Sequence, residues 1–155
     1  MIAVLRFLWF PGLVVAVTCT WIWLDSVMGW RGLHMPRVGT LLLVAGSALA
    51  AWCAVLFYHV GRGSPNPFAA KTRRMVITGP YRVVRNPMMW GIGAILVGLA
   101  LLLGSVGLWF GFSLFVLFVV LFVPGYEERD MERRFGEEYR EYCRRVPRWW
   151  PRWRK

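Results

Sequence analysis

The sequence predicts an all-α integral membrane protein with four transmembrane helices and a C-terminal cytosolic amphipathic helix. Hydrophobic residues make up 57% of the 155 residues, and they are gathered in four runs that carry almost no charge. The four runs are residues 7–24, 39–60, 87–103 and 108–124. Each run approaches or exceeds the roughly 17 residues that a helix needs to cross a bilayer, and none shows the polar stripe of a buried soluble helix. We therefore expect a single membrane domain over residues 1–155, with a cytosolic tail over 125–155.

The basic residues predict the topology. Only Arg31 and Arg37 lie between the first two runs, whereas six arginines and lysines lie between the second and third. Arg129 and nine further basic residues follow the fourth run. Basic loops favour the cytoplasmic side, so we expect a multi-pass protein of the inner membrane with both termini in the cytoplasm. This placement explains the net charge of +11 without nucleic acid, and the Trp- and Arg-rich end suits anionic lipid headgroups.

The first run has an alternative interpretation as a cleaved signal peptide. Arg6 resembles the basic region of such a peptide, but no small-residue cleavage site follows the long apolar stretch. Trp21, Trp23 and Trp30 are typical of an interfacial aromatic belt. These features favour an uncleaved first span.

The polar stretch Thr78–Gly91 connects the basic middle loop to the third run. Gly79-Pro80 predicts a turn, and Tyr81–Arg85 is expected to be extended. Asn86 precedes a proline and is biased out of helical geometry, while Pro87 suits the first position of a helix. The third helix should therefore begin at Pro87 with free N–H groups and Arg85 beside them, an arrangement that suits a carboxylate or phosphate.

The third and fourth runs have equal length, and residues 104–107 form a short turn between them. An antiparallel pair of this kind brings Arg85 close to Glu127 and Glu128. Small residues around Gly46 give the second run a surface for close helix packing. Gly91 and Gly93 leave room for a ligand or a helix, and the Gly107–Gly111 pattern suits packing within the hairpin.

Beyond Pro124, residues 127–144 are expected to form one amphipathic helix that ends before Pro147. Its apolar residues recur at three- and four-residue steps, as Met131, Phe135, Tyr139, Tyr142 and Val146. Such a helix would lie on the membrane or cover the cytoplasmic end of the bundle.

The combination of an arginine, a helix N-terminus, two carboxylates and aromatic rings suits S-adenosylmethionine. Its carboxylate matches Arg85 and the helix end, and its ammonium or ribose hydroxyls match Glu127 or Glu128. Its sulfonium is favoured near carboxylates and near aromatic faces such as Tyr81 or Trp90. Methyl transfer depends on alignment more than on acid–base chemistry. No cysteine or histidine stands in a metal-ligand spacing, and we expect no metal.

Two segments carry a family resemblance. The stretch GPYRVVRNPMMWG at Gly79–Gly91 and the tail EERDMERRFGEEYREYCRRVPRWWP resemble the isoprenylcysteine carboxyl methyltransferase and phospholipid methyltransferase superfamily. Its members carry GPYxxxRHPxYxG and then EExxLxxxFGxxYxxYxxxVPRxxP. The resemblance implies a cytosol-facing site for S-adenosylmethionine, with S-adenosylhomocysteine as product. The expected cofactor-binding residues are Tyr81, Arg85, Asn86, Pro87, Trp90, Gly91, Glu127, Glu128, Tyr139 and Tyr142. Of these, the expected catalytic residues are Arg85, Asn86, Glu127 and Glu128.

The sequence departs from the family pattern at two informative positions. Asn86 stands where many members have histidine, and Met89 stands where tyrosine is usual. We expect a lipophilic methyl acceptor whose identity stays open among a prenylcysteine carboxylate, an amino lipid, a thiol and an isoprenoid acid. The main alternative is a non-catalytic membrane protein that binds anionic lipid or a partner through its basic loop and tail. A transporter is less favoured, because no charged residue lies near the centre of any run.

Overall fold

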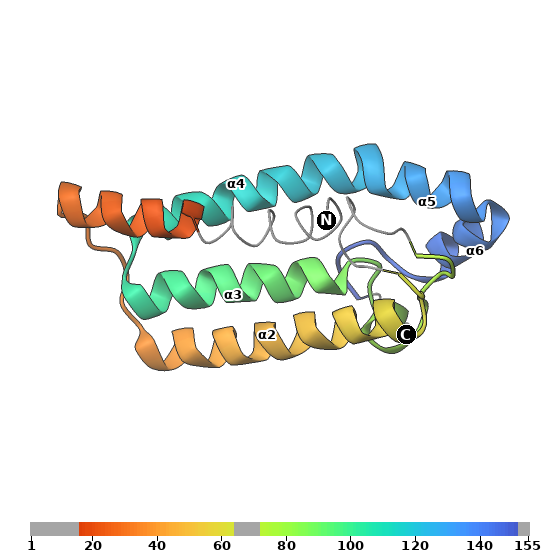
Figure 1. Ribbon diagram of the computed structural model, residues 1–155, viewed down its shortest axis with the longest axis horizontal. Coiled ribbons are helices and arrows are strands. Elements are labelled where there is room, and N and C mark those ends of the chain that lie inside the picture. The colour runs from red at the N-terminus through yellow and green to blue at the C-terminus, as the bar shows by residue number, and fades with distance from the viewer. Residues whose placement is uncertain (1–15, 64–71, 152–155) are drawn as a thin grey trace, which may run out of the picture. The chain divides into compact units, whose positions relative to one another are not determined.

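The computed structural model describes residues 16–63 and 72–151, which form helices and turns without any strand. The chain divides into two compact units. One comprises residues 1–48 and 91–117, and the other comprises residues 49–90 and 118–155. Parts of α2 (Pro36–His59), α3 (Pro87–Leu103) and α4 (Val106–Phe122) belong to each unit (Figure 1). The all-helical prediction is therefore confirmed for the described residues.

Two helices of the described part are long and apolar enough to cross a membrane by length and composition. They are α2 and the continuous helix Val106–Phe135, whereas α3 is apolar but has 17 residues. Helix α3 has the predicted bounds, and α2 begins three residues before its predicted start. Residues 7–15 of the predicted first span, residues 7–24, lie outside the described residues. Residues 16–28 form a helix.

In the first unit, α2 and α3 run side by side (Figure 1). They pack closely because glycines of each helix lie against the backbone of the other. A Cβ added at Gly39 would lie 2.7 Å from the carbonyl oxygen of Gly98, and one added at Gly98 would lie 2.8 Å from that of Gly39. A Cβ at Gly46 would lie 2.6 Å from the carbonyl oxygen of Gly91. The predicted close helix packing of the small-residue surface on α2 is therefore met at Gly46, and Gly91 serves the close helix approach.

The turn between α3 and α4 is held by a buried aspartate of the first unit. Asp25 accepts a short hydrogen bond from the Ser105 hydroxyl, and its carboxylate also accepts from the backbone N–H of Gly107 at 3.0 Å. Ser105 caps α4, since its hydroxyl oxygen accepts from the N–H of Leu108 at 3.1 Å. These bonds satisfy N–H groups that the first turn of a helix otherwise leaves without partners.

The Gly107–Gly111 pattern packs against a different helix from the one predicted. A Cβ added at Gly107 would lie 3.0 Å from the Trp21 side chain, and one at Gly111 would lie 3.6 Å from Trp21 Nε1. The Trp21 ring also meets Phe110 edge to face, with centroids 5.0 Å apart. The two glycines thus make room for a tryptophan of helix 16–28, not for α3.

The second unit has a small core around Cys53, Val76 and Tyr81, all buried. Tyr81 lies in a 3₁₀ turn, Gly79–Arg82, and its ring meets Phe57 edge to face at 5.6 Å. The prediction that Tyr81–Arg85 is extended is therefore wrong at its start. The turn is possible because Gly79 adopts a φ of 59°, and Pro80 supplies a preset φ for the next position.

The chain beyond α4 forms two short helices instead of the one predicted. A π-helical turn, Val123–Glu127, leads into α5 (Glu128–Phe135), and α6 (Glu137–Arg145) follows. The π-helical turn contains Pro124, which lacks the N–H for the usual helical bond. Gly136 separates α5 from α6 with a φ of 54°, a conformation that L side chains rarely adopt.

Candidate functional site

The second unit joins the two sequence motifs by a backbone hydrogen bond. Helix α3 begins at Pro87, as predicted, and Arg85 lies just before it. The backbone N–H of Arg85 donates to the carbonyl oxygen of Pro147 at 2.9 Å. The segment that follows α6 is therefore fastened to the segment that precedes α3.

An ionic cluster lies at this junction. Arg85 Nη1 is 2.9 Å from Glu128 Oε1, and both side chains are largely buried, with 14% and 15% of their surface exposed. Arg148 binds the same carboxylate through two bonds, from Nε to Oε1 at 2.8 Å and from Nη2 to Oε2 at 2.5 Å. Arg85 Nη1 also donates to Cys143 Sγ at 2.8 Å. The predicted proximity of Arg85 to the glutamate pair is thus met at Glu128.

Aromatic side chains provide two further contacts between the motifs. The Tyr142 hydroxyl donates to the carbonyl oxygen of Tyr81 at 2.7 Å, and burial raises the pKa of this phenol, which keeps it protonated as a donor. Trp90 Nε1 donates to the carbonyl oxygen of Trp149 at 3.1 Å, and the Trp90 ring meets Trp150 edge to face. Trp90 therefore holds Trp149 and Trp150 of the tail.

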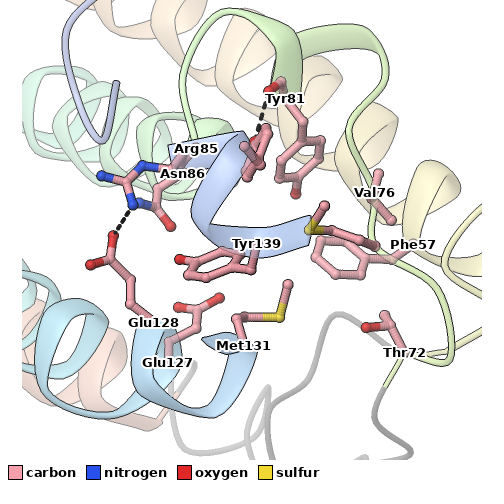
Figure 2. Close-up of a pocket in the computed structure, with 12 residues that line it drawn as sticks. Phe57, Thr72, Val76, Tyr81, Arg85, Asn86, Glu127, Glu128, Met131 and Tyr139 are labelled. Atoms are coloured by element: carbon pink, nitrogen blue, oxygen red, sulfur yellow. Dashed lines mark hydrogen bonds and ion pairs between the residues drawn. The ribbon is translucent and has the colours of Figure 1, made fainter. Parts of the chain in front are cut away.

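A cavity of about 50 Å³ lies among these residues (Figure 2). In Figure 2, the Glu128 carboxylate points to the Arg85 guanidinium, while Glu127 and Met131 lie beside the ring of Tyr139. The lining residues are Phe57, Thr72, Met75, Val76, Tyr81, Arg85, Asn86, Glu127, Glu128, Met131, Tyr139 and Tyr142.

Four buried polar atoms have no hydrogen-bond partner among the described residues, and three of them belong to residues that line this cavity. They are Thr78 Oγ1, Arg85 Nε, Asn86 Nδ2 and Glu127 Oε2. Burial raises the pKa of the Glu127 carboxyl, and the negative charges of Glu128 and Asp130 raise it further. Buried polar groups in proteins are nearly always satisfied, so this concentration of donors and one acceptor indicates a place for a polar ligand or water.

The cavity brings together most of the predicted site residues. Seven of the ten line it: Tyr81, Arg85, Asn86, Glu127, Glu128, Tyr139 and Tyr142. The other three are placed elsewhere: Pro87 is buried at the start of α3, Trp90 contacts the tail, and Gly91 packs against α2. These three residues were predicted to contact a cofactor, but they do not line this cavity.

Several residues of the site were not predicted. Arg148 belongs to the VPR part of the second motif, so the motif itself was a signal for it. Met131 also stands in that motif, and its position one helical turn after Glu127 and Glu128 places it on their side of the helix. Phe57, Thr72 and Val76 come from segments whose sequence carries no comparable signal.

Comparisons with known proteins identify the family of the chain. A model of the phospholipid methyltransferase family matches residues 35–138, well over half of the chain. A 55-residue stretch is 40% identical to an uncharacterised protein of Haemophilus influenzae (strain ATCC 51907 / DSM 11121 / KW20 / Rd), and it covers 36% of this chain and 87% of that protein. No solved structure matches the chain. The chain belongs to the phospholipid methyltransferase family, within the isoprenylcysteine and phospholipid methyltransferase superfamily that its two motifs resemble, and this membership implies methyltransferase activity at a membrane.

Proposed function

We propose that the protein is an integral membrane methyltransferase that uses S-adenosylmethionine and transfers the methyl group to a lipophilic acceptor, as isoprenylcysteine carboxyl methyltransferases do. Family membership supports methyl transfer and a membrane location. The observation that carries the cofactor assignment is the group of buried, unpartnered polar atoms at the junction of the two motifs, in particular Arg85 Nε, Asn86 Nδ2 and Glu127 Oε2.

The residues present fit this cofactor chemically. Arg85 would bind the carboxylate of its amino acid end, since a guanidinium matches a carboxylate in geometry and charge. Glu127 would face the ammonium or the sulfonium, and Asn86 would donate from its free Nδ2. The rings of Tyr81, Tyr139 and Tyr142 would flank the cationic centre. Bound there, S-adenosylmethionine supplies a methyl group on a positively charged sulfur, which is reactive without metal or base.

The protein's own part would be to align the acceptor and to exclude water. The Asn86 amide does not ionise or take up a proton at neutral pH, and the lining of the cavity contains no histidine. Alignment of this kind is effective for displacement at a methyl group. The acceptor would therefore arrive already nucleophilic, with its lipophilic part in the bilayer alongside the apolar helices.

We further propose four transmembrane spans with both termini in the cytoplasm. The distribution of arginines and lysines supports this topology, and it would put the site on the cytosolic side, where S-adenosylmethionine is available. The basic tail and its tryptophans would contact anionic lipid headgroups. The alternative of a non-catalytic membrane protein would leave the unpartnered polar atoms without a role.

The assignment is tested by calorimetric titration of the purified protein with S-adenosylhomocysteine. Arg85→Ala should weaken binding roughly ten- to a hundredfold, because the loss of a hydrogen bond to a charged group costs about 1.5–3 kcal/mol. Arg82→Ala is the matched control, since Arg82 lies in the same motif but is exposed. We expect Glu127→Gln to weaken binding as well.

Two results would contradict the proposal. The first is the absence of binding to the folded wild-type protein, which would favour the non-catalytic alternative. The second is unchanged affinity in folded Arg85→Ala and Glu127→Gln variants, which would place the cofactor elsewhere.

A further inference from the structure

A second cavity adjoins the one described above. It has a volume of about 280 Å³, against about 50 Å³ for the first. Its lining residues are Pro124, Glu128, Arg129, Glu132, Tyr139, Arg140 and Cys143. Ligands of the size of S-adenosylmethionine usually occupy roughly 300–1,000 Å³. Neither cavity is large enough alone, and both are bounded by Glu128 and Tyr139.

Two arginines bind Glu128, which lines both cavities, and they bind it with unequal strength. Arg148 binds its carboxylate through two nitrogen atoms, whereas Arg85 contacts one oxygen through one nitrogen. A two-point guanidinium–carboxylate pair is stronger and better oriented than a one-point contact. The contact with Arg85 is therefore the one that a competing carboxylate would replace.

The charges of the cluster favour such an exchange. Arg85 and Arg148 both pair with the Glu128 carboxylate. One negative charge does not balance two positive charges, so a second carboxylate, that of a ligand, would be attracted to the cluster. Arg85 Nε is buried and has no partner among the described residues, so it offers a further bond to a ligand. With Arg148 in place, Glu128 keeps an ionic partner after it leaves Arg85. Without Arg148, the same movement would leave a largely buried carboxylate unpaired, which is costly.

We propose that Arg148 is a positioning residue that draws Glu128 away from Arg85 when the carboxylate of the cofactor's amino acid end takes its place, and that this exchange joins the two cavities. The inference rests on the proposed cofactor. No covalent bond changes, because one ion pair is replaced by another. Arg148 acts through Glu128 and makes no contact of its own with the cofactor.

The test compares two ligands that differ at the carboxylate. S-adenosylhomocysteine carries the amino acid end, whereas 5′-methylthioadenosine keeps the nucleoside thioether and lacks it. Full-length Arg148→Gln, titrated calorimetrically in detergent micelles, should bind S-adenosylhomocysteine about tenfold more weakly, the equivalent of one charge-assisted hydrogen bond. Its affinity for 5′-methylthioadenosine should stay within about twofold of wild type, the scatter of ordinary surface substitutions. Arg145→Gln is the matched control, since Arg145 is 75% exposed and pairs with Glu141.

A second variant separates positioning from direct contact. In a Glu128→Gln background, Arg148→Gln should no longer change the affinity for S-adenosylhomocysteine, because Arg148 then has no carboxylate to hold. A persisting effect would mean that Arg148 contacts the ligand itself and would overturn the inference. Equal weakening for both ligands would also overturn it, since that pattern indicates a general structural role.

The remaining outcomes are also decisive. Unchanged affinity of Arg148→Gln for S-adenosylhomocysteine refutes the exchange while leaving the proposed function intact. If wild type binds neither ligand, the proposed function and the exchange fall together. Should Arg148→Gln not fold, Arg148→Met takes its place, because it also removes the ionic partner of Glu128. Wild-type affinity for S-adenosylhomocysteine in that variant would count against the exchange.

Discussion

Asn86 bears on which chemistry the proposed site could perform. Its amide lies at the N-terminal end of α3, with Nδ2 buried and unpartnered among the described residues. An amide can donate a hydrogen bond to a ligand, but it cannot take up a proton at neutral pH. Glu127 is a candidate base, and its raised pKa reflects burial more than any catalytic partner. The site is therefore better suited to orienting an existing nucleophile than to generating one.

This interpretation predicts a small effect of restoring a histidine. Asn86→His should change the rate of methyl transfer by much less than the roughly 10²–10⁴-fold that general acid–base catalysis contributes. The measurement is a methyl-transfer assay over lipophilic acids, thiols and amines across pH, with Arg82→His as the control for an added imidazole. Preference for an acceptor that must lose a high-pKa proton, such as an aliphatic alcohol, would show that a base has been missed.

At the level of single residues, the sequence predicted the centre of the site and missed its surroundings. Arg85 and Glu128 could be paired because the apolar runs between them have equal lengths. Arg148 could not be placed in the same way, since its contact depends on how the chain turns after α6. The backbone hydrogen bond from Arg85 to Pro147 fixes that turn, and no periodic pattern in the sequence predicts this bond.

Helix boundaries were predictable where a local signal marked them. Helix α3 begins at Pro87 and ends before Gly104, whose φ of 61° a glycine adopts readily. The tail was predicted as one helix because the apolar period continues through it, and Gly136 was not recognised as a break. Periodicity alone was insufficient there, because it records which face is apolar and not whether the backbone turns.

The partner of the Gly107–Gly111 pattern was wrong for a related reason. A small-residue surface states that another helix approaches, but it does not identify the helix. Trp21 lies more than eighty residues earlier in the chain, and the hairpin partner was assumed because it is adjacent in sequence. For Gly46 no partner helix was predicted, and the structure places Gly91 and Ala94 of α3 against it.

The close approach of α2 and α3 in the first unit predicts a strong position dependence along α3. Gly98→Ala would put a Cβ 2.8 Å from the carbonyl oxygen of Gly39 and from the N–H nitrogen of Leu43, so the backbones must separate. Overpacking of this kind typically costs about 1–3 kcal/mol. We expect a lower midpoint of thermal unfolding for Gly98→Ala in detergent micelles.

Gly93→Ala is the control on the same helix. Its Cβ would make ordinary contacts with Phe112 and Phe115 at 3.6 and 3.8 Å, and alanine favours a helix over glycine by about 1 kcal/mol. Its unfolding midpoint should be unchanged or higher. Equal midpoints for Gly98→Ala and Gly93→Ala would mean that α2 and α3 do not pack as closely as the glycines indicate.

For the whole molecule, the placement of positive charge is the feature that connects sequence to function. The apolar helices indicate a membrane, and the basic residues then predict its sidedness. The proposed cofactor is made in the cytosol, so the proposed function requires the two motifs to face that compartment. Arginines and lysines flank both motifs, and the same residues carry the predicted topology.

The topology is tested by cysteine labelling in intact cells with a membrane-impermeant maleimide. Arg31→Cys should be labelled from outside, because residue 31 is exposed and lies between the first and second predicted spans. Arg74→Cys, also exposed, should be labelled only after the cells are opened, because it lies in the middle loop with the site. The unsubstituted chain, with Cys19, Cys53 and Cys143, gives the background. Labelling of Arg74→Cys from outside would refute the four-span arrangement, because the loop that carries the first motif would then face away from the cytosolic cofactor.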